Sequence, residues 1–191
     1  VIGNEKRFKN ITTNFRRKNT SFIKIKNHNS GPIYSLFLAK NKIKKIIKNN
    51  DFFISYSDIN WKWNFKTVKK YILKKKIVIF SHKGFHPHLE TDSKSDFFLC
   101  NKKKEVNRVS EKKPINNDYK KNNLALGCYY FNNFKYFESY FNIKSFERIR
   151  KKKELYIINL LNFCIKNKVK IHHFELNRFV HLGVPDQYEN Y

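Results

Sequence analysis

The chain has 191 residues, which is enough for one domain of ordinary size. It is 40% hydrophobic and 17% aromatic, so it can bury a sizeable core, and this composition argues against an intrinsically disordered protein. Its 41 Lys and Arg against 15 Asp and Glu give a net charge of +26, which attracts polyanions such as nucleic acid, anionic membranes or nucleotide phosphates.

The positive charge has a second explanation in the codons. The basic excess is almost all Lys, and it comes with abundant Asn, Ile, Phe and Tyr, which a low-GC genome would enrich together. A protein selected to grip nucleic acid more often uses Arg, whose planar fork matches phosphate. We therefore attribute most of the charge to codon bias and expect only a general affinity for anions.

The cysteines and the apolar runs exclude further classes of protein. The three cysteines are odd in number and widely spaced, so neither a disulfide framework nor a structural zinc site is predicted. No apolar run reaches the length of a membrane span, and no signal peptide is apparent. We expect a cytoplasmic protein with no membrane partner. Because the chain begins with Val and contains no Met, we also expect a fragment or a processed piece.

The first half of the chain predicts strands that alternate with helices, the pattern of a doubly wound α/β fold. The run 51–56 is almost continuously apolar, which is typical of a strand buried on both faces of a parallel sheet. The predicted elements are a strand over 21–26, a helix from Pro32 that ends at Asn49-Asn50, the strand over 51–56, a helix over 64–75 with Phe65 turned inward, and a buried strand over 77–80.

The second half is less regular. Its predicted elements are two strands over 97–100 and 105–109 around a basic turn, a loop over 114–123, a strand over 127–131, a helix over 154–166, a strand over 170–176 and a short helix from Asp186. There is no internal repeat and no linker long enough to split the chain. We therefore expect one domain over residues 1–191.

Asp58 is the first candidate for a chemical role. It directly follows an apolar strand, and ligands of open α/β sheets sit beyond the carboxyl ends of the strands. A carboxylate there can hold the divalent cation that phosphoryl or nucleotidyl transfer needs. Position alone equally allows Asp58 to cap the next helix or to close a turn.

Two further segments carry polar side chains of interest. His86 and His88 follow the next strand, and their spacing allows metal ligation, although no third ligand is near and a substrate-lining loop is the better reading. Glu111-Lys112-Lys113-Pro114 precedes a loop, and its lysines could neutralise a phosphate. In a chain this rich in Lys, each one is more often solvated surface.

Seven short segments occur in one order along residues 31–191 and together resemble the sugar-nucleotidyltransferase family. The resemblance is strongest to the branch that makes nucleotide sugars for capsules and other surface polysaccharides, and residues 1–30 match poorly. The segments are Gly31-Pro32-Ile33-Tyr34-Ser35 with Ala39-Lys40, Tyr56-Ser57-Asp58 with Trp61-Lys62-Trp63-Asn64-Phe65, Gly84-Phe85-His86-Pro87-His88, Glu111-Lys112-Lys113-Pro114, Gly127-Cys128-Tyr129-Tyr130-Phe131, Glu154-Leu155-Tyr156 and Gly183-Val184-Pro185-Asp186-Gln187-Tyr188.

The resemblance implies a fold, a reaction and a set of roles. The fold is Rossmann-like, with three layers, a mixed sheet and helices on both faces. In the reaction a sugar 1-phosphate attacks the α-phosphorus of a nucleoside triphosphate, which gives a nucleotide sugar and pyrophosphate. By this resemblance Asp58 holds Mg²⁺, Lys113 or Lys112 meets the sugar phosphate, Gly127 lets the backbone approach the sugar, Glu154 binds sugar hydroxyls, and Tyr34, His86, His88, Glu111 and Asp186 contact substrate.

Two departures from the family pattern bear on activity. The family begins with a glycine-rich loop that binds the triphosphate, whereas Gly3 is the only glycine here before Gly31. Many members also carry a second metal-binding Asp where this chain has His181, a poor ligand for Mg²⁺. The chain is thus predicted to be an N-terminally incomplete nucleotidyltransferase, with two alternatives: a basic nucleic-acid-binding protein, or a catalytically silent scaffold. The base, the sugar and the oligomeric state are open.

Overall fold

The structure is a computed structural model that describes residues 1–4, 20–83, 95–118, 121–143, 146–147, 151 and 154–182. The chain forms two compact units, each built from two separate stretches of sequence. Unit 1 comprises Val1–Asn50 and Phe134–Leu160, and unit 2 comprises Asp51–Asn133 and Leu161–Tyr191. None of the helices in the described ranges is long and apolar enough to cross a membrane. One domain over residues 1–191 stays a prediction.

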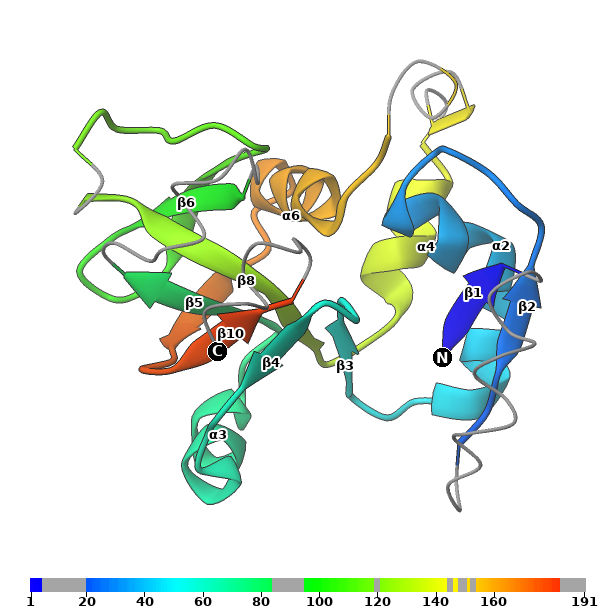
Figure 1. Ribbon diagram of the computed structural model, residues 1–191, viewed down its shortest axis with the longest axis horizontal. Helices are drawn as coiled ribbons and strands as arrows, with labels where there is room; N and C mark the ends of the chain where they lie inside the picture. The colour runs from blue at the N-terminus through cyan, green and yellow to red at the C-terminus, as the bar shows by residue number, and fades with distance from the viewer. Residues whose placement is uncertain are drawn as a thin grey trace. The chain divides into compact units, whose positions relative to one another are not determined.

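Unit 1 is mainly helical (Figure 1). Aromatic side chains join its helices. Phe37 contacts Phe141 and Phe146, with ring centroids 5.3 and 5.1 Å apart. The two short strands pair in parallel. The elements are β1 (Ile2–Asn4), β2 (Ile23–Ile25), α2 (Pro32–Ile47), α4 (Lys135–Phe141) and the first part of α6 (Ile157–Lys166), which continues into unit 2.

The start of α2 is fixed by the backbone of Leu155. The amide of Leu155 donates to the carbonyl of Ser30, and the amide of Ile33 donates to the carbonyl of Leu155, both over 2.9 Å. Gly31, between them, has φ 81° and ψ 177°, a region that is essentially open to glycine alone. A Cβ at Gly31 would lie 2.7 Å from both the nitrogen and the oxygen of Leu155. The Gly-Pro segment is therefore required by close backbone packing.

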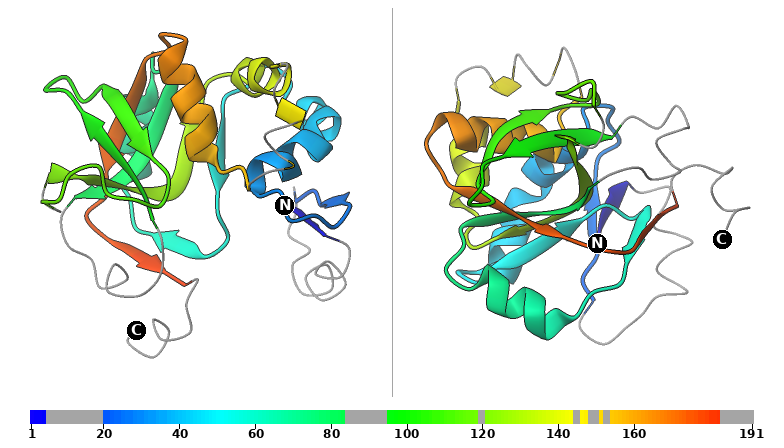
Figure 2. Two further views of the ribbon diagram at one scale, coloured as in Figure 1. Left: turned by 90° about the horizontal axis from the view of Figure 1, so that it is seen from above. Right: turned by 90° about the vertical axis from the view of Figure 1, so that its left-hand side faces the viewer.

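Unit 2 is built on a mixed sheet in the order β7-β6-β8-β5-β9, with β3 also paired to β8 (Figures 1 and 2). The pair β5–β9 is parallel, and the other pairs of this sheet are antiparallel. The strands are β3 (Phe52–Ser55), β5 (Ile77–Lys83), β6 (Asp96–Cys100), β7 (Val106–Ser110), β8 (Asn123–Phe131) and β9 (Ile171–Glu175).

Helices cover both faces of this sheet. On one face, Val68 and Ile72 of α3 (Phe65–Ile72) pack in one cluster with strand residues that include Phe80. The part of α6 from Leu161 lies on the other side of the sheet (Figure 1). A separate antiparallel ribbon joins β4 (Ile59–Trp61) to β10 (Phe179–His181). The three-layer α/β class with a mixed sheet is thus confirmed.

Several local predictions are confirmed as well. The strand over 77–80 is buried and extends to Lys83, and the strand over 127–131 is the second half of β8. The two strands around the basic turn pair as β6 and β7. The helix from Pro32 is present, and so is the strand over 170–176 in the form of β9.

The prediction for residues 51–56 is wrong in two respects. β3 pairs antiparallel with β8, and its residues alternate between half-buried and exposed, with Phe53 37% exposed. The physical reason is its place: among the described strands β3 pairs only with β8, so it forms an edge that is not covered on both faces. A short strand that was not predicted, β4, follows the turn at Asp58, and the helix predicted over 64–75 comes after it as α3.

Two helix predictions also need correction. Phe65 is not turned inward but is 52% exposed, because α3 begins at this residue. The side chain of Asn64 caps that helix by accepting from the amides of Lys66 and Thr67. The helix predicted from Glu154 begins only at Ile157.

We expect the substitution Gly31→Ala to destabilise the protein by about 3 kcal/mol, because the added methyl group meets the Leu155 backbone and the backbone conformation is strained. Urea unfolding followed by circular dichroism measures the change. Lys42→Ala, on the exposed side of α2, is the control and should change stability by less than about 0.5 kcal/mol. Equal effects of both substitutions would contradict the role given to Gly31.

Candidate functional site

Asp58 lies in the turn between β3 and β4, and the β4–β10 ribbon holds it in place. The amide of Leu182 donates to the carbonyl of Asp58 over 2.6 Å, and His181 pairs with Ile59. The structure therefore brings the backbone at His181 next to that at Asp58. These two residues were the predicted metal ligands.

The side chain of Asp58 has one oxygen with unmet hydrogen-bonding capacity. Oδ1 is buried, and no donor in the described part of the chain reaches it. A buried carboxylate oxygen without a donor raises the free energy of the folded state, and a cation offsets that penalty. Within the described ranges, no three His, Cys, Asp or Glu side chains converge as a metal site. Asp58 thus fits a cation as a single protein carboxylate.

Gly127 lies beside the Asp58 turn and shapes it. The pairing of β8 with β5 shifts register between Ile79 and Ser81, and at this bulge Gly127 has φ 71°. The carbonyl of Gly127 accepts from the amide of Tyr56 over 3.0 Å. A Cβ at Gly127 would lie 2.6 Å from the Tyr56 ring and 2.8 Å from Ile59. The glycine thus lets both flanks of the turn pack closely on β8, and its contact with a sugar stays a prediction.

Asp96 is a buried carboxylate that the sequence analysis missed. It is the first residue of β6 and only 8% exposed, and its Oδ1 accepts from the amide of Lys112 over 3.2 Å. Lys112 has φ 55°, so this bond holds the turn Glu111–Lys113 in a left-handed conformation. In the sequence Asp96 lies among Ser, Asp and Lys, where nothing separates it from a solvated carboxylate.

Burial raises the pKa of Asp96 to about 6. The bond from the Lys112 amide lowers this pKa, and the negative charge of Glu111 raises it. Tyr129 is fully buried, and its pKa is raised well above the usual range by burial and then by Tyr56 and Asp96. Tyr129 thus lies within electrostatic reach both of Asp96 and of Tyr56, which precedes Asp58 by two residues.

The other predicted residues are more scattered. Lys113 is exposed beside Lys112. Tyr34 belongs to unit 1, with its ring 4.9 Å from His28 and 5.6 Å from Phe37. Glu154, also in unit 1, accepts a hydrogen bond from the Tyr156 hydroxyl. His86, His88 and Asp186 lie outside the described residues.

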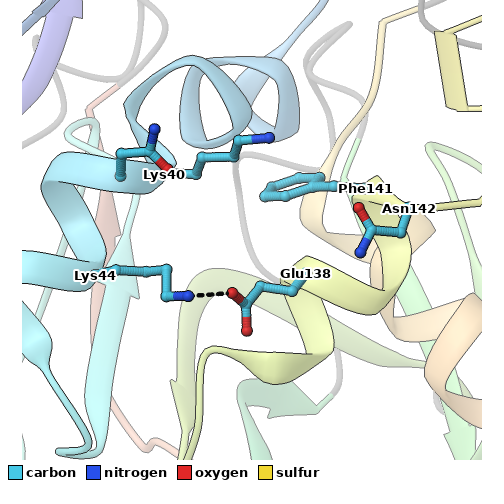
Figure 3. A pocket seen from close by; sticks show the side chains of 6 residues that line it. Lys40, Lys44, Glu138, Phe141 and Asn142 are labelled. Atoms are coloured by element: carbon cyan, nitrogen blue, oxygen red, sulfur yellow. Dashed lines mark hydrogen bonds and ion pairs between the residues drawn. The ribbon is translucent and has the colours of Figure 1, made fainter.

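Unit 1 also contains a polar pocket of about 230 Å³ between α2 and α4 (Figure 3). Lys44 and Glu138 face each other across it and form an ion pair at 2.5 Å. None of the predicted site residues lines it. The lining residues are Lys40, Asn41, Lys44, Glu138, Phe141 and Asn142.

No family model and no curated protein matches the chain. Solved structures do match. A Bacillus anthracis protein assigned as a glucose-1-phosphate thymidylyltransferase superimposes with a TM-score of 0.65 at 15% identity, over 89% of this chain and 63% of its own. The inositol-1-phosphate CTP transferase of T. maritima superimposes with a TM-score of 0.67 at 15% identity, over 96% of this chain and 69% of its own. A nucleoside-diphosphate-sugar pyrophosphorylase of Vibrio cholerae superimposes with a TM-score of 0.63 at 16% identity, over 88% of this chain and 67% of its own.

These likenesses concern the fold. The chain has the mixed α/β fold of the nucleotide-diphospho-sugar transferases, and it spans about two thirds of the length of these proteins. At identities of 15–16%, the residues of a site are not carried over with the fold.

Asp96 predicts a pH-dependent stability. Its folded-state pKa of about 6 lies above the ordinary value of 3.8, so the folded protein holds the proton more tightly than the unfolded chain. The stability that the protonated Asp96 contributes is fully present below about pH 4 and is lost as the pH rises through 6. Asp96→Asn cannot ionise, so at pH 8 it should be more stable than the wild type by about 2–3 kcal/mol.

Urea unfolding of the wild type and of Asp96→Asn, each at pH 4 and at pH 8, measures the effect. At each pH the free energies of unfolding of the two proteins are subtracted, which removes the charge repulsion that both proteins share. Asp118→Asn is the control, because that carboxylate is 46% exposed and has no comparable burial. A wild-type-to-Asp96→Asn difference that is the same at both pH values would show this account of Asp96 to be wrong.

Proposed function

We propose that the protein containing this chain is a sugar-1-phosphate nucleotidyltransferase, which forms a nucleotide sugar and pyrophosphate from a nucleoside triphosphate and a sugar 1-phosphate. The observation that carries the proposal is Asp58, whose buried Oδ1 lacks a donor within the described residues, at a junction of three strands in a nucleotide-diphospho-sugar transferase fold. We further propose a role in surface polysaccharide synthesis in the cytoplasm, on the sequence resemblance alone.

Asp58 suits Mg²⁺ because this ion prefers hard carboxylate oxygens and usually keeps several waters, so one or two protein carboxylates suffice. Bound at Oδ1, Mg²⁺ would neutralise charge on the phosphates. His181 is a neighbour through the backbone, but an imidazole is a poor ligand for this ion. We therefore assign the metal to Asp58 and give His181 at most a role through water.

The remaining residues position substrate. A phosphate oxygen of the sugar 1-phosphate attacks the α-phosphorus, a new P–O bond forms, and the bond to pyrophosphate breaks. Such a reaction depends on alignment and on charge neutralisation more than on proton transfer. Lys112 and Lys113 supply positive charge from a turn that Asp96 anchors. Glu154 and Tyr34 are assigned to the sugar side by the resemblance.

The described neighbours support the substrate class. The T. maritima protein is named for CTP and inositol 1-phosphate, and the Vibrio cholerae protein for nucleoside-diphosphate sugars. Both names pair a nucleotide with a phosphorylated or nucleotide-linked polyol. We propose the same pairing for this protein and leave the base and the sugar to be identified by a substrate panel.

The test is Asp58→Asn in the full-length protein, assayed by pyrophosphate release with a panel of triphosphates and sugar 1-phosphates. Turnover should fall by about 100-fold or more, because the amide oxygen binds the cation more weakly. Affinity for Mn²⁺, measured by electron paramagnetic resonance, should fall by about tenfold or more. The fold should be retained, because the β4–β10 ribbon holds Asp58 through its backbone carbonyl.

Glu175→Gln is the matched control, since this carboxylate is exposed at the end of β9. It should keep both turnover and Mn²⁺ affinity. Unchanged turnover in Asp58→Asn would remove the assignment of Asp58. The absence of pyrophosphate release from the full-length protein with every substrate pair would leave the silent scaffold as the better account.

A further inference from the structure

Four neighbouring strands of unit 2 each contribute one polar side chain to a single hydrogen-bonded group. The strands are β6, β8, β5 and β9, and the side chains are Cys100, Asn123, Ser81 and His173. His173 is 5% exposed, Asn123 7% and Ser81 0%, while Cys100 is half-buried at the end of β6. The group thus runs from the surface into the core.

The contacts form one chain of hydrogen bonds. Nδ2 of Asn123 lies 3.7 Å from Sγ of Cys100, Sγ lies 3.4 Å from Nε2 of His173, and Nδ1 of His173 lies 3.0 Å from Oγ of Ser81. Oγ of Ser81 in turn lies 3.4 Å from the carbonyl of Phe174. One direction of donation satisfies every contact, namely from the amide to sulfur, from S–H to Nε2, from Nδ1–H to Oγ, and from O–H to the carbonyl.

In this arrangement a neutral imidazole presents its lone pair to the thiol proton. Burial, followed by the charges of Lys104 and Lys83, lowers the pKa of His173 to about 4, so His173 is neutral at pH 7. The amide of Asn123 adds a donor to the sulfur of Cys100. These are the elements of a Cys–His pair whose base is oriented by a third group.

The other two cysteines provide a contrast within the same chain. Cys128 is 0% exposed and Cys164 is 1% exposed, and burial raises the pKa of each thiol to about 12. Neither has a described contact with an imidazole. Reactivity of cysteines follows thiolate character and access, so these two are inert packing residues.

We propose that Cys100 is a modification site at which the chain forms a mixed disulfide with a small anionic disulfide, with His173 as proton acceptor and Ser81 and Asn123 as positioning residues. Sγ attacks one sulfur of the disulfide, one S–S bond forms, and the original S–S bond breaks. The thiol proton passes to Nε2 of His173 and from there to solvent, and the second sulfur of the original disulfide leaves as a thiolate. The exchange needs no further oxidant, and Lys83 and Lys104 account for the preference for an anionic partner.

The experiment follows the release of thiolate from the anionic disulfide 5,5′-dithiobis(2-nitrobenzoate) by the folded protein at pH 7.5, with the labelled residue identified by mass spectrometry. The reference is a peptide of residues 96–104, which carries the same cysteine and Lys104 but lacks Lys83 and His173. Cys100 in the folded protein should react about tenfold faster than the peptide. With the neutral reagent 4,4′-dithiodipyridine the advantage should shrink.

Variants then test the mechanism. His173→Gln should bring the rate down to that of the peptide. His172→Gln is the matched control, because its side chain points to the opposite face of β9, and it should leave the rate unchanged. Ser81→Ala should lower the rate about threefold and keeps the proposal testable if His173→Gln does not fold.

Two outcomes would overturn the proposal. One is a rate for folded Cys100 equal to or below that of the peptide, which would make the group a satisfied core network and nothing more. The other is an undiminished rate in a folded His173→Gln protein. Neither outcome depends on nucleotidyl transfer, so the proposed function is tested separately.

Discussion

The sheet of unit 2 and the placement of Asp58 both depend on β8. All nine residues of this strand are buried, and it pairs with β5 along one edge and with β3 and β6 along the other. One irregularity, the bulge at Gly127, lets Tyr56 and Ile59 approach the strand closely. The turn that carries Asp58 lies between these two residues. The placement of the candidate metal ligand therefore follows from a glycine in a neighbouring strand, where any side chain would push the turn away.

Apolar runs and glycines were the sequence features that predicted local structure correctly. The strand from Ile77 and the Gly-Pro helix start are local patterns with local causes, and both are present. The burial of β3 was misjudged because an apolar run does not reveal whether a strand is central or at an edge. Asp96 was missed because its burial comes from a turn 16 residues later in the chain. Pairing partners and distant turns decide such cases, and neither is encoded in one short segment.

The Cys100–His173 group and Asp58, both in unit 2, differ in whether their polar atoms have hydrogen-bond partners. Around Cys100 and His173 every polar group has a partner, so the group is stable without a ligand, and the proposed proton transfer would follow a hydrogen bond that is already formed. At Asp58 one buried oxygen has no donor in the described ranges, so the folded state gains when a cation binds there. The first site predicts reactivity, and the second predicts affinity.

The abundance of Lys is visible in the backbone itself. In the described part of the chain, the non-glycine residues with positive φ are all lysines: Lys48, Lys74, Lys104, Lys112 and Lys168. Three of them follow the ends of α2, α3 and α6, where glycine or asparagine is the usual choice. A lysine in this conformation is strained by about 1 kcal/mol, partly offset at a helix C-terminus by the attraction of its charge to the dipole. Codon bias as the main source of the net charge stays a prediction. Lysines therefore occur at turns of many kinds in this chain, and Lys112 is distinguished from the others by the bond between its amide and Asp96, not by its charge.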